Sequence, residues 1–242
     1  NSCFNNSILL YLFAIKTEVF SQTDVTSNIK PHMTNISETL TETIKDDKFQ
    51  DVIVDLSETT LDTLLKDGAL KDIPIIGVLF GIAKTTLTVQ DKLFTKKLMV
   101  FLLQLKKTSN ESRKKQIEKI ENDPEYKTKV GEKLLYIIDK CEDHEKAKYI
   151  GKLFQCFIEE KIEYDNFLRA SRSIELTYLG DLKRFIKDKW KDMAMEEGGD
   201  LLGAGLMDAI YSSGESMHGN SSSYLKLKVS YIGILIQDLL AE

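Results

Sequence analysis

The chain has 242 residues, of which 42% are hydrophobic and 29% are charged. This composition is typical of a folded protein with a buried core and unlike that of a disordered one. The net charge of -5 gives no overall attraction to nucleic acid or to an anionic membrane. Three widely spaced cysteines argue against a disulfide framework and favour a reducing compartment. We therefore expect a cytoplasmic protein.

The first 68 residues predict two amphipathic helices. In the first, hydrophobic residues recur at steps of three and four from Ile29 to Ile44, with Pro31 near the start. The same spacing continues from Phe49 to Leu65, and Gly68 is a plausible end of the second helix. The other faces of both helices are rich in Ser, Thr and acids, so we expect those faces to be exposed to solvent.

Residues 69–105 are the most apolar part of the chain, and Asp72 and Pro74 predict a helix start within it. A membrane span needs about 20 mainly apolar residues. Residues 73–90 fall short of this and carry Lys84 near their middle. We predict a buried core hairpin, with a membrane span or a helix that inserts on activation as alternatives. The residues that would make such membrane or interaction contacts are Ile75, Lys84 and the small pair Gly77 and Gly81.

The middle of the chain predicts further helices. One apolar stripe runs from Leu87 to Leu105, one helix is expected to begin at Asp123-Pro124, and Asp143 is a candidate N-cap for the next. A long helix is predicted to run from Phe167 to the Lys187–Lys191 region. Together these elements predict an all-α fold in the main, an antiparallel bundle of about six or seven helices.

One basic cluster lies between residues 106 and 119. It consists of Lys106, Lys107, Arg113, Lys114, Lys115 and Lys119. Glu111, Glu118 and Glu121 are interleaved with it, which is typical of ion pairing between successive turns on a solvated helix. Contact with an anionic partner such as a lipid headgroup or RNA is the alternative.

The chain carries no recognisable catalytic or cofactor motif. Cys141 and His144 have metal-like spacing and Cys156 lies one helix away, but no second closely spaced pair accompanies them. Neither a Gly-x-Ser-x-Gly elbow nor a glycine-rich phosphate loop occurs. The sequence therefore predicts no metal, no cofactor, no small-molecule substrate and no enzymatic activity.

The composition changes after residue 192, where glycine and serine become frequent. Leu225, Leu227 and Val229 alternate with lysines, which predicts a half-exposed strand, and a helix is expected to follow it. This order of helix, hairpin, strand and helix resembles the second half of a winged-helix module. Residues 192–225 hold six acids and no Lys or Arg, so they would repel DNA. We predict a wing that packs or binds protein.

We expect three regions: N-terminal helices in residues 1–68, a central bundle in 69–191, and a C-terminal winged-helix-like hairpin element in 192–242.

Four segments taken together resemble a loose group of uncharacterised all-helical bacterial proteins, some associated with anti-phage or abortive-infection loci. The segments are 73–77 (IPIIG), 131–135 (GEKLL), 145–154 (EKAKYIGKLF) and 162–168 (Ile162, Tyr164, Phe167 and Leu168). The resemblance covers residues 69–242 and implies a helical fold and a role in bacterial defence. It carries over no functional residue.

These observations predict a non-enzymatic helical protein that acts through contacts with a protein partner or with itself. Two alternatives stay open. One is a membrane-active effector that inserts residues 73–105, and the other is a winged-helix transcriptional regulator.

The membrane alternative predicts where the full-length protein is found after cell fractionation. We expect the wild type in the soluble fraction, because Lys84 makes insertion of the apolar segment costly by about 2.5–3.5 kcal/mol. The Lys84→Leu variant calibrates the assay, since it removes this cost. A wild type recovered with the membranes would contradict the core-hairpin prediction.

Overall fold

The computed structural model describes residues 30–49, 73–81, 88–124, 126, 129–215 and 221–241. The described residues are mainly helical, with a small antiparallel sheet near the C-terminus, which confirms the predicted fold class. The α-helices are α2 (Lys30–Lys45), α5 (Pro74–Gly81), α6 (Val89–Gln104), α7 (Asn110–Glu121), α8 (Val130–Lys140), α9 (His144–Ile158), α10 (Tyr164–Leu176), α11 (Leu179–Asp188), α12 (Met195–Gly203) and α13 (Tyr231–Leu240). A short 3-10 helix, η2 (Leu105–Lys107), follows α6.

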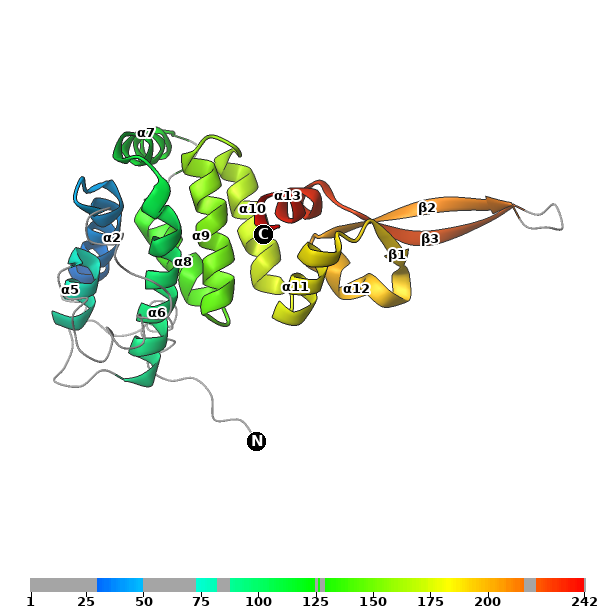
Figure 1. The fold of residues 1–242 in the computed structure, drawn as a ribbon, viewed down its shortest axis with the longest axis horizontal. Helices are drawn as coiled ribbons and strands as arrows, with labels where there is room; N and C mark the ends of the chain where they lie inside the picture. Colours follow the sequence, from blue (N-terminus) through cyan, green and yellow to red (C-terminus); the bar gives the residue numbers. More distant parts are fainter. Residues whose placement is uncertain are drawn as a thin grey trace, which may run out of the picture.

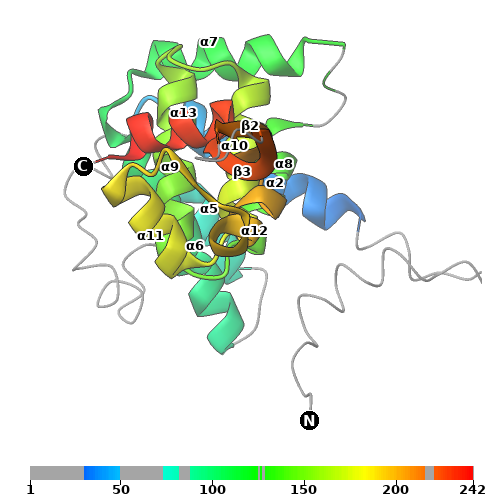
Figure 2. The same cartoon turned by 90° about the vertical axis from the view of Figure 1, so that its right-hand side faces the viewer.

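The helices form an elongated row from which the sheet projects at one end (Figure 1). Helices α2, α5 and α7 lie at the other end, and α2 packs against α5, α7 and α8. The largest helix–helix contact joins α6 to α9 in the middle of the row, and α10 and α13 continue the packing towards the sheet. Figure 2 looks along the row from the sheet end.

An aromatic cluster fills the core where α6, α9 and α10 meet. The ring of Phe154 lies 5.6 Å from that of Phe101 on α6 and 5.2 Å from that of Phe167 on α10, centroid to centroid. All three side chains are fully buried. Such aromatic pairs add to the free energy gained by burying their surface, so this cluster fixes the centre of the bundle.

Two of the predicted helix starts are confirmed. Helix α5 begins at Pro74, and Asp143 caps α9 by accepting hydrogen bonds from the backbone N–H groups of Glu145 and Lys146. The predicted start at Asp123-Pro124 is wrong, because α8 begins at Val130. Phe167, in the first turn of α10, is fully buried.

The predicted long helix from Phe167 to the Lys187–Lys191 region is instead two helices. Helix α10 ends at Leu176, Thr177 is extended with ψ 135°, and α11 begins at Leu179. The Thr177 hydroxyl donates to the Ser173 carbonyl and so satisfies one group at the end of α10. The hydrophobic spacing continues through the break, which is why the sequence pattern did not reveal it.

The described Ser and Thr side chains of α2 are buried, which corrects the expectation of a solvated face for them, whereas the acids Glu38 and Glu42 are exposed as expected. Ser37, Thr39, Thr41 and Thr43 are all less than a tenth exposed. Thr41 and Thr43 donate their hydroxyl hydrogens to backbone carbonyls one turn earlier, at Ser37 and Thr39. Hydroxyls satisfied in this way can be buried at little cost, so α2 can be surrounded by α5, α7 and α8.

The sheet has three strands, β1 (Asp192–Ala194), β2 (Met207–Glu215) and β3 (Ser221–Val229), in the order β1-β3-β2. Both pairings are antiparallel. Helix α12 connects β1 to β2 and packs against all three strands. The predicted strand is β3, whereas β1 and the length of β2 were not predicted.

The close contact between α2 and α8 predicts that a methyl group added at Gly131 will lower the stability of the protein. A Cβ there would overlap the Ser37 carbonyl oxygen and lie 2.5 Å from the Thr41 hydroxyl oxygen. We expect Gly131→Ala to lower the free energy of unfolding by about 1–3 kcal/mol, because the two helices must separate. Chemical denaturation followed by circular dichroism would measure it.

Gly199→Ala in α12 is the matched control, since a Cβ there meets nothing within 4 Å. Alanine is favoured over glycine within helices, so this change should leave stability equal or slightly higher. Equal behaviour of the two variants would contradict the close packing of α2 on α8.

Candidate functional site

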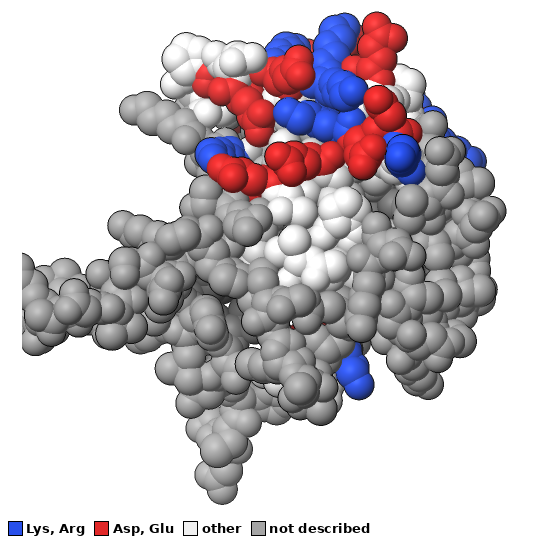
Figure 3. Space-filling model, turned by 90° about the vertical axis from the view of Figure 1, so that its left-hand side faces the viewer, with Lys and Arg blue, Asp and Glu red and all other residues white. Residues whose placement is uncertain are grey.

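The predicted basic cluster does not form one surface patch. Lys106 and Lys107 lie in η2 and the other four residues lie on α7. Arg113 is fully buried and therefore cannot meet a partner at the surface. Lys114 pairs with Asp47, with 3.1 Å between Nζ and Oδ1, and Lys115 pairs with Glu160 at 2.5 Å. On the face that carries α2 and α7, basic and acidic side chains are interleaved (Figure 3).

Arg113 instead joins α7 to the end of α2. Its Nε donates to the Ile44 carbonyl at 2.6 Å and its Nη2 to the Asp46 carbonyl at 3.1 Å, while Nη1 donates to the Thr108 carbonyl at 2.5 Å. The guanidinium also lies over the Phe49 ring, 4.8 Å from its centroid. Burial lowers the pKa of Arg113, and the nearby carboxylates of Asp47 and Asp46 oppose this. The role of this residue is therefore structural.

The candidate membrane or interaction residues are spread over different environments. Ile75 is fully buried in α5, Gly77 is half-buried, Gly81 ends the helix, and Lys84 lies outside the described residues. No helix in the described ranges combines the length and the apolar character needed to cross a bilayer. Whether the apolar segment ever enters a membrane stays a prediction, and its residues 82–87 lie outside the described ranges.

The spacing of Cys141, His144 and Cys156 does not create a metal centre within the described part of the chain. No group of three His, Cys, Asp or Glu side chains there is arranged to hold a metal ion. Burial raises the pKa of the Cys141 thiol to about 12 and also raises that of Cys156. Both thiols are therefore protonated near neutral pH and are poor ligands and nucleophiles.

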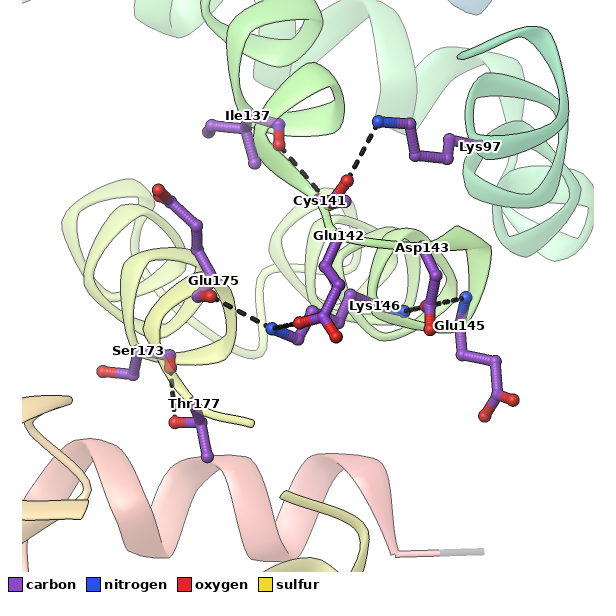
Figure 4. Close-up of polar contacts among 10 residues, drawn as sticks. All are labelled: Lys97, Ile137, Cys141, Glu142, Asp143, Glu145, Lys146, Ser173, Glu175 and Thr177. Carbon is purple, nitrogen blue, oxygen red and sulfur yellow. Dashed lines mark hydrogen bonds and ion pairs between the residues drawn. The ribbon is translucent and has the colours of Figure 1, made fainter. Parts of the chain in front are cut away.

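The half-buried Lys97 and the buried Lys146, both near Cys141, contact backbone carbonyls at helix ends (Figure 4). Lys97 on α6 donates to the carbonyls of Asp139 and Cys141 at 2.8 and 2.9 Å, at the end of α8. Lys146 is only 1% exposed and donates to the Glu142 carboxylate and to the Glu175 carbonyl near the end of α10. Burial lowers the pKa of Lys97. These contacts join α6 to the end of α8 and α9 to the end of α10.

A groove of about 350 Å³ lies between α2, the end of α7 and the start of α8. It is lined by Glu38, Thr41, Glu42, Lys45, Glu121, Tyr126 and Lys129. Lys129 pairs with Glu38 at 2.5 Å and Lys45 approaches Glu121 at 3.9 Å, so charges within the groove are largely compensated. This balance gives the groove no clear preference for a charged ligand.

The feature that stands apart from the helical body is the hairpin of β2 and β3, which projects from the row (Figure 1). Nine consecutive residue pairs join the two strands, from Met207↔Val229 to Glu215↔Ser221, without a bulge. Strand β1 covers β3 only at Lys226, Leu227 and Lys228. The outer half of the hairpin therefore has no third strand beside it in the described structure.

One face of the hairpin is apolar beyond the point where the core ends. Met207 and Leu227 lie on this face and are buried, close to α12. Further out, Tyr211 and Leu225 form the next apolar cross-strand pair on the same face. Tyr211 is 83% exposed and Leu225 is 37% exposed. The apolar face of the sheet thus continues from the core into solvent.

Strand β2 also has a free hydrogen-bonding edge. The Ser230 N–H donates to the Leu206 carbonyl, and the Val229 N–H donates to Lys191 on the β1 side. In an antiparallel ladder, residues whose backbone groups bond to the neighbouring strand alternate with residues whose backbone groups point away from it. The Leu206–Ser230 bond sets this alternation, so the backbone groups of Ala209, Tyr211 and Ser213 point away from β3. The sheet order leaves these groups without a strand partner among the described residues.

Sequence reasoning missed this edge and singled out the apolar segment and the basic cluster instead. The alternation in β3 was visible, but the outer half of β2 contains Ser212, Ser213 and Gly214 in place of alternating apolar residues. Its sequence therefore resembled a loop. The signal that was available is the match of Met207, Ala209 and Tyr211 with the apolar side of β3.

Comparison of the chain with protein-family models, with curated proteins and with solved structures gives no match.

The buried guanidinium predicts a large loss of stability on its removal. We expect Arg113→Met to lower the free energy of unfolding by about 2–4 kcal/mol, because several carbonyls at the end of α2 and before α7 lose their donor. Thermal unfolding would report it as a lower Tm. Lys119→Met, at an exposed position of the same helix, is the control and should change stability by about 0.5 kcal/mol or less.

Proposed function

We propose that this protein works by binding another protein, without catalysing a reaction of its own, and that the hairpin of β2 and β3 is the binding surface. The proposal rests on the long edge of β2, which has no strand partner among the described residues and belongs to a hairpin that projects from the body. An open strand edge is a template for pairing with an extended segment of another chain.

The edge of β2 has few of the features by which proteins protect such strands. Exposed edges are usually shortened, bulged, or broken by lysine and proline. Strand β2 is nine residues long, contains neither lysine nor proline, and pairs with β3 without a bulge. Its charged residues are Asp208 and Glu215, which leaves residues 209–214 uncharged. This supports a surface kept open for a partner.

Tyr211 supplies a side chain suited to such a contact. Tyrosine is enriched at the centres of protein interfaces because its ring adds a large contact area with little loss of conformational freedom. Tyr211 lies in the middle of the strand and is 83% exposed. A strand added at the edge of β2 would run beside this ring.

The other predicted functions stay predictions. A role in bacterial anti-phage defence depends on the resemblance of the four sequence segments. A membrane-active effector depends on residues 73–105, of which 82–87 lie outside the described ranges. A winged-helix regulator is disfavoured by exposed acids at Glu196, Glu197 and Asp200, which would repel the phosphates of DNA.

Site-specific photo-crosslinking in living cells of the native host tests the proposed surface. With the photoreactive residue benzoylphenylalanine at position 211, we expect a discrete crosslinked product that contains this chain and a second protein. The same residue in place of Tyr136 or Tyr178 is the control, since both tyrosines are exposed on the helical body. Crosslinking that is no stronger at 211 than at the body positions would overturn the proposal.

A further inference from the structure

The hairpin and its neighbouring helix carry an excess of negative charge. Residues 192–230 contain six acidic residues and two lysines. Asp192 pairs with Lys226 at 3.3 Å. The carboxylates of Glu196, Glu197, Asp200 and Asp208 are exposed and form no ion pair within the described part of the chain. The first three lie on α12, which packs against β2, and the fourth lies on β2 itself.

The two faces of β2 carry different side chains, which a strand added at its edge would meet. Ala209 and Tyr211 lie on the apolar face, whereas Asp208 and Ile210 lie on the opposite face, where the register places Asp208 across from Lys228 of β3. Side chains of a strand placed at the edge alternate between the same two faces. A residue beside Tyr211 would therefore be apolar, and a residue beside Asp208 would be basic.

We infer that the partner segment is an extended, positively charged stretch in which basic and apolar residues alternate, and that it adds to the sheet as a fourth strand beside β2. This inference depends on the proposed function, since it names the chemistry of the partner for the same surface. The carboxylates that form no ion pair with a described residue attract the basic side chains, and the outward backbone groups of Ala209, Tyr211 and Ser213 supply the hydrogen bonds.

A second copy of the chain fits the edge less well. In an antiparallel pairing of two β2 strands, acidic residues would meet no basic residue, because β2 contains none. Two acidic modules of this kind would also approach each other with like charge. Charge complementarity therefore favours a basic partner over self-pairing.

Binding of a synthetic peptide to the full-length protein tests the inference. The probe is a fluorescent, capped peptide of seven residues in which lysine and valine alternate. The control peptide has glutamate in place of lysine. We expect the lysine peptide to bind by fluorescence anisotropy, more weakly as salt is raised, and the glutamate peptide not to bind. A lysine–valine peptide N-methylated on alternate amides should also fail, because it cannot pair along the edge.

Two variants of the protein locate the binding. Ala209→Pro removes an outward N–H without removing a hydrogen bond to β3, and proline is tolerated at such edge positions. We expect it to weaken lysine-peptide binding roughly fivefold to tenfold, whereas Ala209→Ser, which keeps the N–H, should not. Asp208→Asn should weaken binding by about twofold to fivefold and reduce its salt dependence. Circular dichroism checks that each variant is folded.

The outcomes separate this inference from the proposed function. Equal binding of the lysine and glutamate peptides, or binding unchanged in folded Ala209→Pro, would overturn the inference. If the lysine peptide does not bind but crosslinking from position 211 still occurs, the partner has another chemistry and the proposed surface stands. A dimer by light scattering that is lost in Ala209→Pro would identify a second copy as the occupant and also overturn the inference. Failure of both peptide binding and crosslinking would remove both proposals.

Discussion

The packing of this protein depends on side chains that donate hydrogen bonds to the ends of neighbouring helices. The last turn of a helix leaves carbonyl groups without partners and carries a partial negative charge. Arg113 supplies donors to the end of α2, Lys97 to the end of α8, and Lys146 to the end of α10. Gln237 on α13 does the same at the end of α11 through the carbonyls of Phe185 and Trp190. Each contact satisfies carbonyls at a helix end and fixes the position of one helix against another.

Close contacts at glycine work together with these donors. Gly131 brings α8 against α2, and Gly151 brings α9 against α6, where a Cβ would lie 2.8 Å from the Phe101 carbonyl oxygen. The side-chain donors join other pairs of helices, so the glycine contacts and the donors together fix more of the bundle than either does alone. The hairpin is attached to this packed helical body.

The sequence predicted the helical class, the extent of α2 and the cap at Asp143, because these depend on local spacing and on residues within one turn. It did not predict that the threonines of α2 are buried or that a helix ends at Leu176. Both depend on which helices surround a segment, and local periodicity carries no such information. Arg113 illustrates the same limit. Its sequence neighbours Lys114 and Lys115 are alike in charge, yet only Arg113 points into the core. The edge of β2 was missed because strand order is a property of the whole sheet.

The attachment of the hairpin gives it a gradient of local stability along its length. At its base, β3 lies between β1 and β2, and Leu227 is buried beneath α12. Further out, the pairs from Tyr211↔Leu225 to Glu215↔Ser221 have no third strand beside them among the described residues. Local opening needs the least free energy where few buried contacts resist it, so backbone amides near the tip should exchange with solvent sooner than those near the base. A partner that orders the outer half would then slow this exchange most strongly far from the helical body, where the free protein protects its amides least.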